Sequence, residues 1–115
     1  MELRVEQLVG NVTMVIPVGR WDVSGAAQID LRLSAISGSG RPVIIDLAEV
    51  THLSSMGIRS IVMSAKATRL KGGTSVLLSP APNVEAVLTA AGIDTLIAIH
   101  HDLDEAVLAV TTQGP

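Results

Sequence analysis

Two neighbouring serines, Ser54 and Ser55, stand where a polar loop gives way to an amphipathic pattern. A serine at a helix start can cap the helix by accepting a backbone N–H, and a serine hydroxyl can act as a nucleophile when a base activates it. The nucleophile elbow of serine hydrolases has the pattern G-x-S-x-G, whereas Leu53-Ser54-Ser55-Met56-Gly57 has only the second glycine. The pattern therefore favours helix capping over hydrolysis.

Other side chains with acid–base or metal-binding chemistry do not complete a reactive site. His52 precedes Ser54 by two positions, and no spacing rule places its ring on the hydroxyl. His100 and His101 would point to opposite sides of an extended chain, which favours a solvated turn over a metal site. Asp46 lies in an apolar strand, where its carboxylate is expected to accept backbone N–H groups of the following loop. We predict no catalytic residue, no metal and no cofactor.

The serines are expected to lie between a buried strand and a long helix. Residues 42–47, PVIIDL, form an apolar run too short for a helix, which predicts a central strand. From Ser54 or Ser55 onward, helical spacing places four apolar residues on one face: Ile58, Ile61, Val62 and Ala65. Lys71 in the last turn and the pair Gly72-Gly73 end this helix. The two hydroxyls are therefore expected at a positively polarised helix start.

The opposite side of the same helix is also partly apolar. It carries two methionines, an alanine and a leucine with two flanking cations: Met56, Met63, Ala67, Leu70, Arg59 and Lys66. Methionine side chains adapt to irregular partners, and apolar patches framed by polar residues are typical of protein-binding surfaces. We interpret this side as a surface for another protein. Trp21 beside Asp22 is either an exposed anchor or a residue packed over the end of the sheet.

The preceding residues predict an edge strand, a returning strand and a helix: Met1–Leu8, Val12–Val18 and Gly25–Ser37. Gly10-Asn11 can supply the turn of a hairpin, and Pro17 limits further pairing of the second strand. Asp22 or Ser24 could cap the helix.

The following residues predict a strand, a helix, a last strand and a helix after Asp102: 74–78, 84–91, 96–99 and 103–110. Asn83 and Asp102 are the expected caps of the two helices, and residues 111–115, TTQGP, are expected to fray. A hairpin followed by three strand–helix repeats predicts an α/β fold, with a mixed β-sheet and flanking helices.

Composition excludes several classes of function. With 115 residues the chain is expected to form one domain, residues 1–115, and the lack of cysteine excludes disulfides and thiolate chemistry. A net charge of −3 and a single aromatic residue, Trp21, oppose nucleic-acid binding. No apolar run is long enough for membrane insertion, and the charged N-terminus is unlike a signal peptide. We expect a cytoplasmic protein.

Several motifs resemble those of the STAS domain, the fold of bacterial anti-sigma factor antagonists, and the resemblance covers most of the chain. They are DLAEV at residues 46–50, LSSMG at 53–57, GRWD at 19–22 and KGG at 71–73. By this match, Ser55 falls on the position that is phosphorylated in the antagonists. Ser54 replaces their usual aspartate and Met56 their small hydroxyl residue, which leaves Ser54 as an alternative phosphate acceptor.

The resemblance implies a protein without catalysis of its own that acts by partner switching. The implied partner is both anti-sigma factor and serine kinase, of the histidine-kinase-like ATPase fold, and a serine phosphatase could restore the free hydroxyl. The expected partner-binding residues are Trp21, Asp22, Ser54, Ser55, Met56, Arg59, Met63 and Lys66. The alternative is a STAS scaffold that is not phosphorylated, or a ligand-sensing subunit of a signalling or transport complex.

Overall fold

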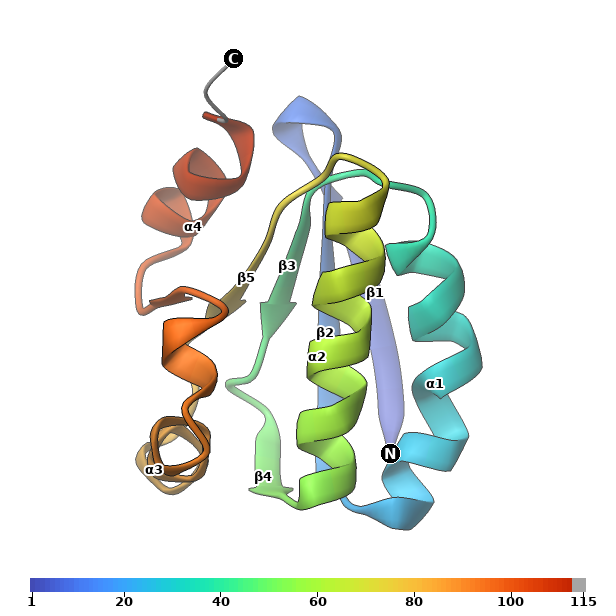
Figure 1. Ribbon diagram of the computed structural model, residues 1–115, viewed down its shortest axis with the longest axis vertical. Coiled ribbons are helices and arrows are strands. Elements are labelled where there is room, and N and C mark those ends of the chain that lie inside the picture. Colours follow the sequence, from blue (N-terminus) through green and yellow to red (C-terminus); the bar gives the residue numbers. More distant parts are fainter. Residues whose placement is uncertain (113–115) are drawn as a thin grey trace.

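Six strands form one mixed sheet in the computed structural model, which describes residues 1–112 (Figure 1). The strands are β1 (Glu2–Leu8), β2 (Val12–Trp21), β3 (Val43–Asp46), β4 (Val50–Leu53), β5 (Ser75–Leu78) and β6 (Ile99–His100). The helices are α1 (Val23–Ser37), α2 (Ser55–Leu70), α3 (Pro82–Ala90) and α4 (Leu103–Thr111). This arrangement confirms the predicted α/β class, the N-terminal hairpin and the mixed sheet. Residues 113–115 of the expected frayed tail lie outside the described residues, whereas Thr111 belongs to α4.

The sheet has the order β1-β2-β3-β5-β6, and β4 also pairs with β2. Within residues 1–112, the β1–β2 pair is the only antiparallel one, and Gly10 and Asn11 have positive φ in the short 3₁₀ turn (Val9–Asn11) between the two strands. The expectation that Pro17 limits further pairing of β2 is wrong, because the strand pairs with β4 beyond it. Residues 13–15 of β2 pair with β3 and residues 19–21 pair with β4, so Pro17 lies between the two parallel ladders. Its missing N–H therefore removes no bond from either ladder.

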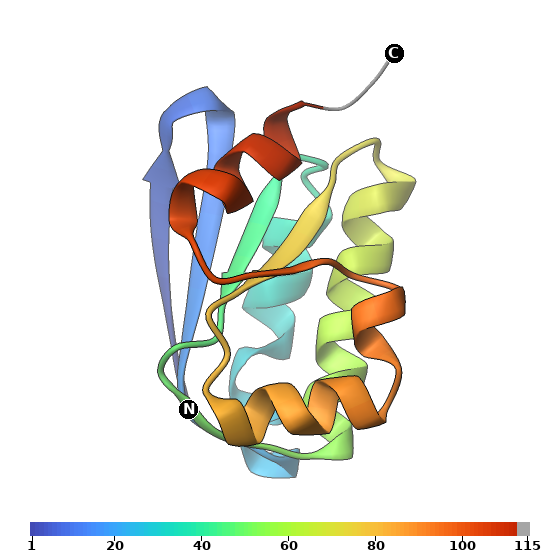
Figure 2. The ribbon, with the colours of Figure 1, turned by 90° about the vertical axis from the view of Figure 1, so that its left-hand side faces the viewer.

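Helices cover both faces of the sheet (Figure 2). One core lies under α1, α2 and α3, and includes Ile45, Leu33, Ile61 and Leu88. A smaller core lies on the other face, where Ala106 and Val110 of α4 pack on strand residues such as Ile44. Helix α4 therefore covers the face of the sheet that would otherwise expose the central strands.

The contact between α1 and α2 is made largely by small and polar residues. The hydroxyls of Ser37 and Ser64 lie 2.6 Å apart, and Ser60 donates to Asp30 over 2.7 Å. The prediction that apolar residues form the core face of α2 is therefore partly wrong. Ile61 is fully buried, but Ile58, Val62 and Ala65 are only partly buried, and the other buried positions are Gly57, Ser60, Ser64 and Thr68. Small residues bring the backbones of the two helices close together, which rotates α2 relative to its apolar pattern.

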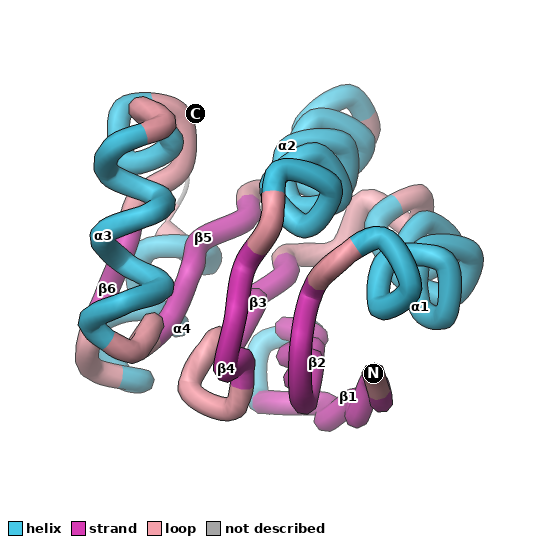
Figure 3. Tube along the Cα trace, turned by 90° about the horizontal axis from the view of Figure 1, so that it is seen from below, coloured by secondary structure: helices cyan, strands magenta, loops and turns pink. Residues whose placement is uncertain are grey.

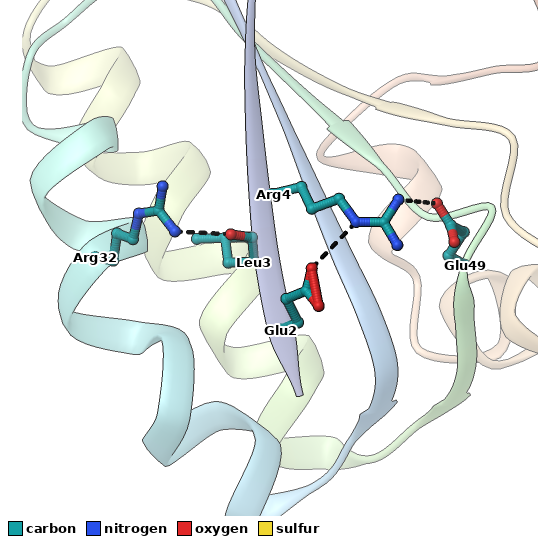
Figure 4. Close-up of polar contacts among 5 residues, drawn as sticks. All are labelled: Glu2, Leu3, Arg4, Arg32 and Glu49. Atoms are coloured by element: carbon teal, nitrogen blue, oxygen red, sulfur yellow. Dashed lines mark hydrogen bonds and ion pairs between the residues drawn. The ribbon is translucent and has the colours of Figure 1, made fainter.

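Charged side chains lie along the free edge of the sheet, which β1 forms (Figure 4). Arg32 of α1 donates to the backbone oxygen of Leu3 over 2.7 Å. Arg4 forms ion pairs with Glu2 at 3.1 Å and with Glu49 at 3.3 Å. Edge strands present unpaired backbone groups, and charges on them oppose pairing with another chain.

From β4 onward, the chain departs from prediction in three places. Strand β4 was expected to be loop, and the last strand is Ile99–His100 rather than residues 96–99. Helix α3 begins at Pro82 without a side-chain cap, because the amide of Asn83 donates instead to the backbone oxygen of Thr51 over 3.1 Å. The prediction that Asp102 caps α4 is confirmed, with Glu105 N donating to Oδ2 over 2.9 Å.

Candidate functional site

Two helix N-termini lie side by side at one end of the sheet, as seen from that end in Figure 3. Strand β2 leads into α1 and strand β4 leads into α2. Because these strands are parallel neighbours, with Trp21 paired to Leu53, their helices begin together. The positive ends of two helix dipoles therefore meet at the predicted serines.

Asp22, one of the two caps that the sequence allowed, caps the first of these helices. Its Oδ1 accepts the N–H of Gly25 over 2.9 Å, and its Oδ2 lies 3.6 Å from the guanidinium of Arg20. The Gly25 hydrogen bond is the main cause that lowers the pKa of Asp22, and the charge of Arg20 adds to it. The site therefore holds one ionised carboxylate beside the serines.

Ser54 is the cap of the second helix. Its hydroxyl donates to the backbone oxygen of Trp21 over 2.9 Å and accepts the N–H of Gly57 over 3.4 Å. The N–H of Ser54 also donates to the same Trp21 oxygen, over 3.0 Å. This residue therefore ties the start of α2 to the end of β2.

Ser55 is different from its neighbour. It is the first residue of α2 and is exposed. Within residues 1–112, its hydroxyl makes no hydrogen bond. The structure thus separates two adjacent serines into one structural hydroxyl and one hydroxyl that is open to chemistry from outside.

Trp21 lies beneath this surface and not on it. Its side chain is 0% exposed, so the expectation of an exposed partner contact is wrong, and the alternative of packing at the sheet end is right. Gly57 lies directly over it: a Cβ there would be 2.7 Å from the Trp21 oxygen and 2.9 Å from its Cγ. The glycine of the LSSMG motif is therefore needed for the close approach of α2 to β2.

The outer side of α2 borders a groove of about 460 Å³ against α1. Met56, Arg59, Met63 and Ala67 line it, and Met63 is 57% exposed. From α1 it receives three residues that sequence reasoning missed: Asp30, Leu33 and Ser34. The only sequence feature that could have indicated them is the spacing of Asp30 and Ser34, which lie one helical turn apart next to the buried Leu33. Lys66 does not join this groove but borders a second hollow on the other flank of α2.

The other titratable residues stand apart from the serines. Asp46 accepts the N–H of Ala48 over 3.0 Å, as predicted, and His101 pairs with Glu85 at 2.8 Å. His52 makes no hydrogen bond to either serine in the part of the chain that the structure describes. Within that part, no group of three His, Asp or Glu residues could hold a metal ion, and no helix is long and apolar enough to cross a membrane.

The fold recurs in known proteins. The STAS domain family matches residues 4–106. The candidate anti-sigma factor antagonist BtrV of Bordetella bronchiseptica is 27% identical over 116 residues, which cover 100% of this chain and 99% of that protein.

Two solved structures show the same fold. An anti-sigma factor antagonist from Mycobacterium paratuberculosis has a TM-score of 0.85 at 23% identity, over 95% of this chain and 92% of that one. The phosphorylated form of the Bacillus cell fate determinant SpoIIAA has a TM-score of 0.70 at 18% identity, over 92% of this chain and 96% of that one. Because the family match spans nearly all described elements, from β1 into α4, the chain belongs to the STAS domain family and resembles its anti-sigma factor antagonists.

Proposed function

We propose that this protein is an anti-sigma factor antagonist that acts by partner switching. It binds an anti-sigma factor while Ser55 carries a free hydroxyl, and it is released once Ser55 is phosphorylated. The observation that carries the proposal is the exposed hydroxyl of Ser55 at the first position of α2, beside a Ser54 hydroxyl that is already engaged. The family match and the name of BtrV support the class of partner.

Geometry favours Ser55 over Ser54 as the phosphate acceptor. A kinase must bring the acceptor oxygen to its ATP, which an exposed hydroxyl without a hydrogen bond permits. Phosphorylation of Ser54 would break its bonds to Trp21 and Gly57 and remove the helix cap, which typically contributes about 1 kcal/mol. We infer that the partner is the serine kinase itself, of the histidine-kinase-like ATPase fold, and that a serine phosphatase reverses the modification.

The groove between α1 and α2 is the proposed continuation of the binding surface. Its exposed Met63 and partly buried Met56 offer apolar contact, while Arg59 and Asp30 offer one charge of each sign. Interfaces of this kind combine apolar anchors with a polar rim. A partner segment with an apolar side chain between polar neighbours would fit it.

A phosphate on Ser55 would change the interface more than the fold. It would carry about −1.5 to −2 charges at neutral pH, which the N–H groups and positive dipole end of α2 can accommodate. Arg59, one turn further along α2, is also within reach of such a group. Burial of the same charge against a partner without new cations would cost several kcal/mol, and each 1.4 kcal/mol is about a tenfold change in affinity.

The test uses the full chain with a candidate serine kinase of the histidine-kinase-like ATPase fold from the same organism. Intact mass spectrometry should show one added phosphate on the wild type and on Ser54→Ala, but none on Ser55→Ala. In titration calorimetry, unmodified protein and Ser55→Ala should bind, whereas phosphorylated protein should bind about a hundredfold more weakly or worse. Circular dichroism checks that each form is folded. Phosphate on Ser54, or equal affinity of both forms, would contradict the switch; binding without any phosphate transfer would support a scaffold.

The groove has its own prediction. Met63→Glu should weaken partner binding at least tenfold while leaving the melting temperature nearly unchanged, because the side chain is exposed but central in the proposed surface. The matched control is Leu108→Glu, an equally exposed apolar residue on α4 across the sheet. The groove is excluded as a contact if both variants bind like the wild type.

A further inference from the structure

A second hollow lies on the other flank of α2, away from the proposed partner surface. It encloses about 240 Å³ between the last turns of α2, the start of β5 and the segment before β6. Its apolar walls are Val62 and Ala65 of α2 with Leu96 and Ile97. Leu96 is 68% exposed although it is apolar, so part of this wall faces water.

Two cations stand over these apolar walls. Lys66 and Arg69 both line the hollow, three positions apart on one side of α2. Neither forms an ion pair or a side-chain hydrogen bond with any of residues 1–112. Ser75 also borders the hollow, and its shielded hydroxyl has no hydrogen-bond partner among the described residues. Rotation about χ1 to another staggered position would let this hydroxyl donate a hydrogen bond to a ligand.

The charges favour an anion in spite of the helix dipole. The C-terminal end of α2 contributes about half a negative charge, whereas Lys66 and Arg69 together carry two positive charges. Among the residues that the structure describes, no carboxylate lines the hollow to neutralise them. The free energy of bringing an anion to this place is therefore dominated by the two cations.

We propose that this hollow binds a small organic monocarboxylate with a short apolar tail. The carboxylate would lie between Lys66 and Arg69, and the tail would contact Val62, Ala65 and Ile97. The volume is below the roughly 300–1,000 Å³ of pockets that enclose drug-sized ligands, which favours a short chain over a nucleotide. The proposal does not rest on the switch at Ser55, which is at the opposite end of α2.

The test is an NMR titration of the full unmodified protein with hexanoate. Hexanoate has about eight non-hydrogen atoms, for which a dissociation constant of roughly 1 mM is attainable. We expect saturable shifts centred on Val62, Ala65 and Ile97. Hexanol, which lacks the charge, and acetate, which lacks the tail, should each bind at least tenfold more weakly.

Variants separate this site from general anion binding. The double variant Lys66→Gln with Arg69→Gln should weaken hexanoate at least tenfold, whereas Lys71→Gln, a neighbouring exposed cation that does not line the hollow, should not. The melting temperature of each variant shows that it is folded. Equal affinity of the double variant, equal binding of hexanol, or shifts located in the α1–α2 groove would overturn the proposal. The proposal would also be overturned if a peptide from the partner protein, and not hexanoate, saturated this hollow.

Discussion

At the scale of single residues, Ser54 and Ser55 show how one chemical group takes two roles. The hydroxyl of Ser54 is hydrogen-bonded to Trp21 and Gly57, whereas Ser55 is an exposed residue. The sequence predicted a helix start at one of the two, but not which serine would be the cap. That choice depends on the position of β2, which lies more than 30 residues earlier in the chain.

The carboxylate of Asp22 gives a pH dependence at the same scale. Its pKa is lowered from the ordinary 3.8 in the folded protein, so its ionised form stabilises the fold above the unfolded-state pKa. This contribution is lost as the pH falls through the folded-state pKa. NMR titration of the side-chain carboxyl carbon should show a midpoint below 3.8.

The control for this effect is Asp22→Asn, because asparagine caps helices about as well as aspartate. It should lower the unfolding free energy little at neutral pH and make it less sensitive to acid below pH 4 or so. Asp22→Ala should instead destabilise at both pH values. A midpoint at or above 3.8 would show that the Gly25 hydrogen bond does not favour the ionised form.

At the scale of elements, α2 is rotated relative to the phase that its apolar residues predict. Hydrophobic periodicity counts large apolar residues, whereas the contact with α1 depends on small ones, such as Ser64, that let two helices approach closely. The sequence therefore identified the helix and the outward Met63 correctly. It assigned Ile58, Val62 and Ala65 too deep a position, and Met56, which packs partly buried against the same core, too exposed a one.

This rotation has a direct consequence for stability. Ile61→Ala should lower the free energy of unfolding by about 2–5 kcal/mol, because a side chain with 0% exposure leaves a cavity. Ile58→Ala is the matched control and should cost clearly less, since Ile58 is only partly buried. Chemical denaturation of both variants measures the difference. Equal losses would show that the apolar pattern, and not the small residues, sets the orientation of α2.

At the scale of the whole molecule, the smaller core on the second face of the sheet depends on α4 for its cover. Val110 of α4 is buried on Ile44 and Val76, whereas Leu108 of the same helix is exposed. Val110→Asp should therefore destabilise by more than about 3 kcal/mol, because it buries a carboxylate without a partner. Leu108→Asp should be nearly neutral. If thermal unfolding leaves both variants unchanged, α4 does not close the second face.

Apart from β4, the order of elements was predictable from the sequence, but some pairings were not. The hairpin, β3 and the helices carry strong periodic or turn signals. Strand β4, VTHL, has two exposed polar residues between two buried ones, which gives neither alternation nor an apolar run. It is a strand only because the end of β2 is there to pair with it. The groove residues of α1 were missed for the same reason, since only the packed structure brings Asp30 and Ser34 to α2.

Because Trp21 is buried, its intrinsic fluorescence can report on the conformation of the protein around it. Trp21 is the only aromatic residue of the chain, so intrinsic fluorescence comes from one indole at one place. That indole lies under Gly57, and its backbone oxygen holds Ser54, while its Nε1 has no hydrogen-bond partner in the described structure. Emission should therefore be that of a dry indole in the free protein. Any movement of the start of α2, whether by phosphate or by a partner, should be visible in its wavelength and intensity without a label.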